Sequence, residues 1–127
     1  MRLRTVIGML TMLAASPVSA QTQHEARAKE IFKQLVEINT THSVGDTTKA
    51  AEAMAVRLKA AGFPSEDVQV LGPNPRKGNL IARYRGNGQR NPLLLLAHLD
   101  VVEARRDDWS VDPFTFLERG GYFWGRG

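Results

Sequence analysis

Two stretches of the chain carry apolar residues at three- and four-residue spacing, over residues 24–38 and 47–61. This spacing is typical of amphipathic helices with one buried face. Asp46 precedes the second stretch as a potential N-cap, while Gly62 and Pro64 follow it as stop signals. The pattern therefore predicts two consecutive helices. Their expected buried positions are Ala28, Ile31, Phe32, Leu35 and Val36 in the first helix and Ala51, Met54, Ala55 and Leu58 in the second.

Beyond the helices, the hydrophobic pattern changes to that of β-strands. Alternation predicts strands over residues 67–71 and 79–85, and a short strand over residues 120–125. Residues 92–99 do not alternate, and such a continuous apolar run indicates a strand buried on both faces of a sheet. A buried helix is the alternative for this run, but its short length favours a strand. Helices followed by strands predict the α/β class, with the helices packed on a mixed β-sheet.

The first 20 residues have the pattern of a secretory signal peptide. Arg2 and Arg4 form a basic start, a short apolar stretch follows, and residues 18–20 offer small side chains to a signal peptidase. An uncleaved anchor or a buried helix is the alternative. We expect residues 21–127 to form the mature chain, secreted or periplasmic. Because no second long apolar run follows, we expect no stable membrane insertion after signal cleavage.

Composition narrows the classes of function. The chain is 43% hydrophobic and 24% charged, which is ordinary for a folded globular protein. Its formal charge of +4 falls to +2 without the two arginines of the signal, and this small, scattered charge argues against a nucleic-acid partner. The chain has no Cys, so a metal site would have to use His and carboxylate ligands.

His98 and Asp100 are the polar residues with the clearest chemical potential. They stand two positions apart at the end of the apolar run, so on a strand both would lie on one face. The carboxyl edge of an α/β sheet is where ligands bind. A neutral imidazole there can hold a metal through one nitrogen while a carboxylate accepts the other N–H and fixes the tautomer. On spacing alone, a purely structural hydrogen-bonded pair is the common alternative.

The pair stands at the start of an ordered series of motifs that spans about thirty residues. The series is Leu95-Leu96-Ala97-His98-Leu99-Asp100-Val101-Val102, Trp109, Asp112-Pro113-Phe114, Gly120-Gly121, Tyr122 and Gly125-Arg126-Gly127. With these motifs in this order, the chain resembles the zinc-dependent M20 peptidase family of aminoacylase and carboxypeptidase-like amidohydrolases. Weaker similarity extends upstream, over residues 39–43 and 61–63.

The resemblance implies roles for two residues. His98 matches the family's first zinc ligand, and Asp100 matches the catalytic-site aspartate that orients that His. It also implies two zinc ions in the full-length parent, which activate a water and polarise an amide carbonyl, with a Glu as general base. The other ligands, the Glu and a dimerisation domain would all lie beyond Gly127. The resemblance thus implies the incomplete N-terminal part of a zinc-peptidase catalytic domain, truncated at its C-terminus.

These implications lead to an expected function and one alternative. We expect the full-length parent to hydrolyse amide bonds of a peptide or acyl-amino acid substrate, with homodimer formation left open. Because one His and one Asp cannot hold two metals, we expect the 127-residue chain to bind zinc weakly and to hydrolyse nothing alone. The alternative is a non-catalytic secreted fragment that binds a partner or peptide at an exposed sheet edge.

The remaining candidates have simpler interpretations. We expect His24 and His42 to be solvent-exposed rather than metal ligands. The acidic residues of the 103–112 loop lack the glycine turn and spaced oxygen ligands of a calcium loop. Asp112 is instead expected to fix a turn. The aromatic side chains of the last predicted strand fit packing on a sheet better than a platform for substrate.

Overall fold

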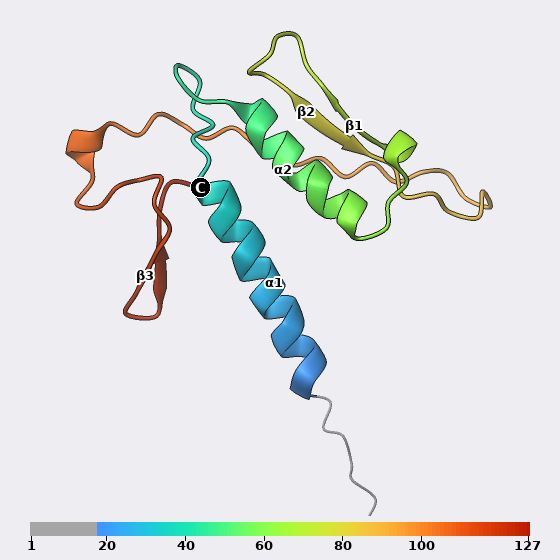
Figure 1. The fold of residues 1–127 in the computed structure, drawn as a ribbon, viewed down its shortest axis with the longest axis horizontal. Helices are drawn as coiled ribbons and strands as arrows, with labels where there is room; N and C mark the ends of the chain where they lie inside the picture. Colours follow the sequence, from blue (N-terminus) through green and yellow to red (C-terminus); the bar gives the residue numbers. More distant parts are fainter. Residues whose placement is uncertain (1–17) are drawn as a thin grey trace, which may run out of the picture.

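The structure is a computed structural model and describes residues 18–127 (Figure 1). The expected α/β class is confirmed, with two helices and two small antiparallel sheets. Most of the proposed signal peptide, residues 1–17, lies outside the described residues. The elements are α1 (Val18–Val36), α2 (Thr47–Ala60), η1 (Ser65–Asp67), β1 (Val68–Leu71), β2 (Asn79–Ala82), η2 (Arg106–Asp108), β3 (Leu117–Arg119) and β4 (Tyr122–Trp124).

Both predicted helices form, although α1 begins at Val18 rather than near residue 24, and Ala28 and Phe32, which were expected to be buried, are exposed. The Asp46 carboxylate accepts a hydrogen bond from the backbone N–H of Lys49 at 3.1 Å, which caps the start of α2 as expected. At the other end, Gly62 has a φ of +95°, a left-handed conformation that favours glycine. The N–H of Phe63 then donates to the carbonyl of Leu58 at 3.1 Å. No helix within residues 18–127 is both long enough and apolar enough to cross a membrane.

A small core lies where α2 packs across the hairpin of β1 and β2 (Figure 1). The side chains at its centre are small, so the backbones of helix and hairpin approach closely. Gly78 shows how close the approach is, because a Cβ there would lie 2.7 Å from the Thr48 hydroxyl. The same hydroxyl accepts a hydrogen bond from the Gly78 N–H at 2.8 Å. Ala50, Ala51, Ala55 and Val68 are the buried apolar residues of these elements, and Val36 is buried separately at the end of α1.

The hairpin of β3 and β4 packs separately, against α1. Phe32 of the helix contacts Phe116 in an edge-on arrangement, with ring centroids 5.7 Å apart, and Phe123 at 5.9 Å. Beyond the hairpin, the chain returns to the last turn of α1, where a Cβ on Gly125 would lie 2.5 Å from Cγ1 of Val36. Strand β3 had no separate signal in the sequence, whereas β4 falls within the predicted strand.

The buried strand predicted over residues 92–99 is absent. These residues have no secondary structure, and the side chains of Leu93, Leu94, Leu95 and Leu96 are 76–86% exposed. The two observed sheets are isolated two-stranded hairpins, so no strand within the described part of the chain pairs with the leucine segment. Two antiparallel hairpins therefore replace the single mixed sheet that the pattern predicted.

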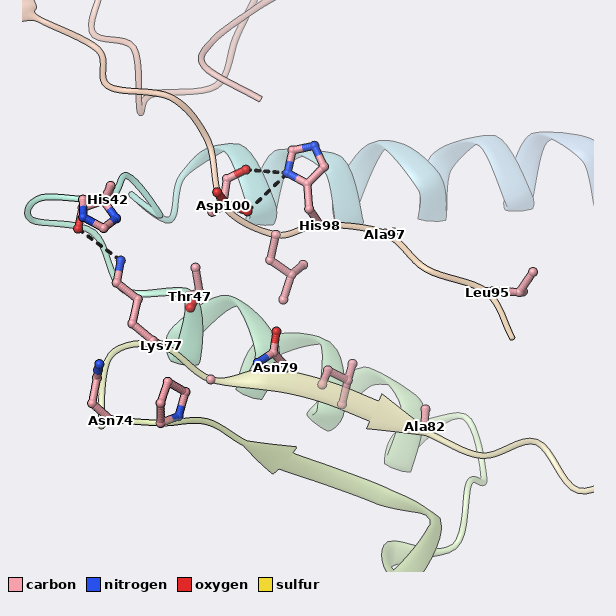
Figure 2. Close-up of a pocket in the computed structure, with 14 residues that line it drawn as sticks. His42, Thr47, Asn74, Lys77, Asn79, Ala82, Leu95, Ala97, His98 and Asp100 are labelled. Carbon is pink, nitrogen blue, oxygen red and sulfur yellow. Dashed lines mark hydrogen bonds and ion pairs between the residues drawn. The ribbon is translucent and has the colours of Figure 1, made fainter. Parts of the chain in front are cut away.

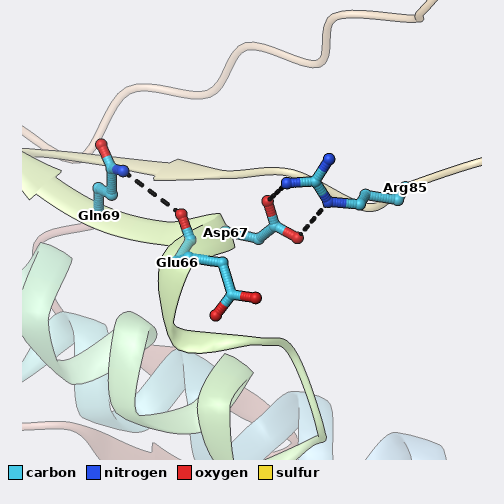
Figure 3. Close-up of polar contacts among 4 residues, drawn as sticks. All are labelled: Glu66, Asp67, Gln69 and Arg85. Atoms are coloured by element: carbon cyan, nitrogen blue, oxygen red, sulfur yellow. Dashed lines mark hydrogen bonds and ion pairs between the residues drawn. The ribbon is translucent and has the colours of Figure 1, made fainter.

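A bidentate ion pair closes the open end of the first hairpin (Figure 3). The Asp67 carboxylate, with 1% of its side chain exposed, accepts hydrogen bonds from Nε of Arg85 at 2.7 Å and from its terminal nitrogen at 2.8 Å. The carbonyl of Asp67 also accepts from the N–H of Arg83 at 2.9 Å, which extends the pairing beyond β2. The hydrogen bonds from Arg85 hold the pKa of Asp67 below its ordinary value.

Replacing this carboxylate should change both the stability and its dependence on pH. Because the pKa of Asp67 is lowered in the folded state, its contribution is complete above the ordinary value of 3.8 and is lost as the pH falls through the folded-state pKa. We expect Asp67→Asn to lower the melting temperature at neutral pH and to flatten its decline in acid. Thermal unfolding followed by circular dichroism from pH 2 to pH 7 would measure both effects.

The matched control is Asp107→Asn, which removes the same charge from the exposed η2 turn. Equal melting temperatures for the Asp67 and Asp107 variants at neutral pH would contradict a stabilising role for the pair.

Candidate functional site

A cavity of about 800 Å³ lies between β2 and the segment that contains residues 95–100 (Figure 2). Its two ends differ in polarity. His42 and Lys77 lie at one end, whereas Leu95 and Ala82 lie at the other. His98 and Asp100 belong to the segment that forms one side of this cavity.

The structure brings His98 and Asp100 together although their segment is not a strand. Nδ1 of His98 lies 2.7 Å from the backbone carbonyl oxygen of Asp100 and 3.4 Å from its carboxylate oxygen Oδ1 (Figure 2). A carbonyl can only accept, so this contact requires a proton on Nδ1. In the neutral imidazole the lone pair is then on Nε2, which has no hydrogen-bond partner within residues 18–127.

This geometry fits one ligand of a zinc site and the group that orients it. Zinc accepts an imidazole nitrogen whose partner N–H is held by a carbonyl or a carboxylate. The His98 side chain is 84% exposed, so its Nε2 is accessible. No cluster of three or more His, Cys, Asp or Glu residues in the described part of the chain could hold a metal ion. The residues present therefore fit part of a zinc site.

A loop between the two helices, residues 39–46, holds the segment that carries the pair. The Thr40 hydroxyl donates a hydrogen bond to the carbonyl of Leu99 at 2.8 Å. Ser43 donates twice to the Glu103 carboxylate, from its backbone N–H at 2.9 Å and from its hydroxyl at 3.0 Å. These two contacts lie on either side of Asp100. The loop belongs to the weaker part of the resemblance, but nothing in the sequence singled out Glu103 as its partner.

Local hydrogen bonds and one glycine give this loop its shape. The Asn39 side chain accepts from the N–H of Thr41 at 3.0 Å and from its hydroxyl at 2.8 Å, an arrangement typical of an Asx turn. The Gly45 N–H donates to the carbonyl of Thr41 at 3.1 Å. A Cβ on Gly45 would lie 2.2 Å from the Thr41 nitrogen, so the loop closes only because this residue has no side chain.

The loop that joins β1 to β2 supports the 39–46 loop from its other side. Lys77 donates from Nζ to the carbonyl of His42 at 3.1 Å, and Arg76 donates from its guanidinium to the carbonyl of Ser43 at 3.1 Å. Thr47, at the start of α2, also bonds to the Arg76 carbonyl, from its backbone N–H at 3.1 Å. Three parts of the chain that are distant in sequence therefore meet at this loop.

The other sequence candidates can be placed as well. His24 and His42 are exposed, as expected. The Asp112 carboxylate accepts from the N–H of Phe114 at 2.8 Å, which confirms the expected turn. The packing expected for the aromatic residues of β4 is incorrect for Tyr122, which is 72% exposed, since within residues 18–127 β4 pairs with β3 alone. The Trp124 ring instead lies under the guanidinium of Arg119, which belongs to β3 and stands opposite Tyr122, with 5.3 Å between the guanidinium carbon and the ring centre.

Comparison with curated proteins identifies relatives that agree with the resemblance. The chain is 33% identical over 125 residues to an N-fatty-acyl-amino acid synthase/hydrolase from Mus musculus, which covers 89% of this chain and 24% of the relative. It is 30% identical over 99 residues to aminoacylase-1 from Sus scrofa, covering 76% of this chain and 24% of the relative. A succinyl-diaminopimelate desuccinylase from Bordetella petrii is 38% identical over 76 residues, covering 58% and 18%.

These relatives are hydrolases of the M20 family, so the family resemblance is supported at that level. The chain spans about a quarter or less of the length of each of these three. No protein-family profile matches the chain, and no solved structure matches it significantly.

The Ser43–Glu103 contact should be sensitive to acid. The hydrogen bond from the Ser43 N–H, aided by the Ser43 hydroxyl and the charges of His42 and Lys77, holds the pKa of Glu103 below its ordinary value of 4.5. Since the folded-state pKa is lowered, the contact is complete above pH 4.5 and weakens as the pH falls through the lower folded-state value. An NMR titration of the Glu103 side-chain carboxyl should give a midpoint below 4.5, and Ser43→Ala should move it upward. A wild-type midpoint at or above 4.5 would contradict the contact.

Proposed function

We propose that this chain is the N-terminal part of the catalytic domain of a zinc-dependent M20-type hydrolase. One observation carries the proposal. Nε2 of His98 is accessible, while Nδ1 of the same ring lies 2.7 Å from the backbone carbonyl oxygen of Asp100. This pair occurs within the ordered motif series, in a chain whose similarity to an N-fatty-acyl-amino acid synthase/hydrolase extends over 89% of its length.

In this proposal, each of the two residues has a defined role. His98 holds a zinc ion through Nε2, and Asp100 keeps the imidazole in the required tautomer and orientation. Bound zinc supplies a Lewis acid that polarises an amide carbonyl and lowers the pKa of a water. The second zinc ion, the remaining ligands and the general base come from elsewhere in the full-length protein.

The proposed substrates are N-acyl amino acids or peptides. The names of two relatives describe action on acyl-amino acids, and a third describes removal of a succinyl group. The first name covers both synthesis and hydrolysis of an N-acyl amino acid, and the other two are those of an acylase and a desuccinylase, which supports hydrolysis of an N-acyl amino compound as the proposed reaction. The signal-like pattern of residues 1–20 supports a secreted or periplasmic location for the enzyme.

On its own, the chain is proposed to be inactive. One imidazole is too few ligands for a stable zinc site, and zinc in catalytic sites has three protein ligands. In the full-length enzyme, the exposed leucine segment of residues 93–96 is proposed to be covered by strands that the rest of the polypeptide supplies.

The same exposed segment supports a second candidate, a non-catalytic role in binding a partner by strand addition. Its leucines are 76–86% exposed, and its backbone pairs with no strand of the described chain. The gene sequence after the Gly127 codon distinguishes the two candidates. An in-frame continuation supports the enzyme, whereas a stop codon favours the binding role.

The enzyme proposal predicts the effect of removing the imidazole from the full-length protein. His98→Ala should remove one zinc ion per subunit and nearly all hydrolysis of N-acyl amino acids, because the ligand is lost. Zinc content by plasma emission spectrometry and turnover of acetyl-, succinyl- and fatty-acyl-amino acids would measure both. The control is His24→Ala, an exposed residue of α1. Normal zinc content and turnover in the His98 variant would refute the assignment.

A further inference from the structure

The segment that carries His98 pairs with no strand of residues 18–127, yet binding of a metal by His98 requires that the position of this segment be fixed. Residues 92–105 contain no helix or strand. Two side-chain contacts tie this segment to the 39–46 loop, one at the carbonyl of Leu99 and one at the carboxylate of Glu103. Because they lie one residue before and three residues after Asp100, they fix the backbone on both sides of it.

The contact at Leu99 acts directly on the geometry of the pair. The hydrogen bond from Thr40 to the Leu99 carbonyl sets the plane of the peptide bond between Leu99 and Asp100. His98 and Asp100 are the two neighbours of Leu99 in the sequence, so the orientation of this peptide bond affects both. The 2.7 Å contact of the imidazole is with a backbone carbonyl, so it depends on the course of the backbone as much as on a side-chain rotamer.

The loop that carries Thr40 is itself held firmly in place, so it can fix the position of Leu99. Thr40 is 2% exposed and Thr41 is 1% exposed, which is unusual for polar residues in a loop. The side chain of Asn39 holds Thr41 in place, and Lys77 and Arg76 bond to the loop from its other side. The loop therefore cannot shift without breaking hydrogen bonds in several directions.

We propose that Thr40, together with the pair Ser43 and Glu103, positions His98 and Asp100 for binding zinc. This inference rests on the proposed function, since it concerns the same metal site. These three residues touch neither metal nor substrate. They act through the backbone, by holding the segment 98–103 against the loop between α1 and α2.

The buried contact is tested with threonine variants of the full-length protein. Thr40→Val keeps the shape of the side chain but removes the hydroxyl, and should weaken zinc affinity about 10-fold, the lower end of the range for groups that orient metal ligands. Thr40→Ser keeps the hydroxyl and should restore affinity close to the wild-type value. Zinc affinity is measured by competition with a chromogenic chelator. Turnover should fall in kcat rather than in KM, because the substrate contacts are unchanged.

The matched control is Thr41→Val, which removes a hydroxyl that is equally buried in the same loop. That hydroxyl bonds to Asn39 and does not reach the segment 98–103. If Thr41→Val weakens zinc binding as much as Thr40→Val, the effect comes from general loosening of the loop and the proposal is wrong.

The exposed contact provides an independent test that does not disturb a buried site. Ser43→Ala removes the hydroxyl bond, whereas Glu103→Ala removes both bonds, and each should weaken zinc binding. The double variant should bind zinc no more weakly than Glu103→Ala alone, because without the carboxylate the Ser43 hydroxyl has no contact left to lose. These variants decide the question if Thr40→Val fails to fold. Wild-type affinity in folded variants of both contacts would overturn the positioning role, whereas a wild-type protein without zinc would overturn the proposed function itself.

Discussion

The geometry of the candidate site depends on the hydrogen bonds between the loop that joins α1 to α2 and residues 99–103. The leucine segment before it has no paired strand, and its side chains are largely exposed. An unpaired stretch of backbone can take many courses. The hydrogen bonds from Thr40 and Ser43 select one of these courses, and the position of the His98 imidazole follows from that choice.

The elements that could be predicted from the sequence are those whose signals are local. Both helices follow from apolar spacing, and Asp46 and Gly62 act as the cap and the stop that their residue types suggest. The strand over residues 92–99 was predicted incorrectly because burial on both faces requires neighbours that a local pattern cannot supply. The contact from Thr40 to Leu99 spans 59 positions in sequence, and neither residue type predicts it.

The candidate site divides in the same way. Spacing placed His98 near Asp100, and the structure agrees, although it does so without a strand and with the Asp100 carbonyl closer than the carboxylate. A residue two positions ahead can turn its own carbonyl toward a preceding ring when the backbone is irregular, which strand geometry does not allow. The proposed reaction could not be inferred from this geometry, because only the surrounding motifs and the relatives connect the pair to amide hydrolysis.

The glycines also determine where a side chain can be added without disturbing the site. A Cβ on Gly45 would collide with backbone atoms of Thr41, and nearly every neighbour of Gly45 in the 39–46 loop is held by a hydrogen bond. A Cβ on Gly86 or Gly88 would meet nothing within 4 Å. A side chain at Gly86 would therefore leave the imidazole where it is, whereas a side chain at Gly45 would displace the loop that holds residues 99–103.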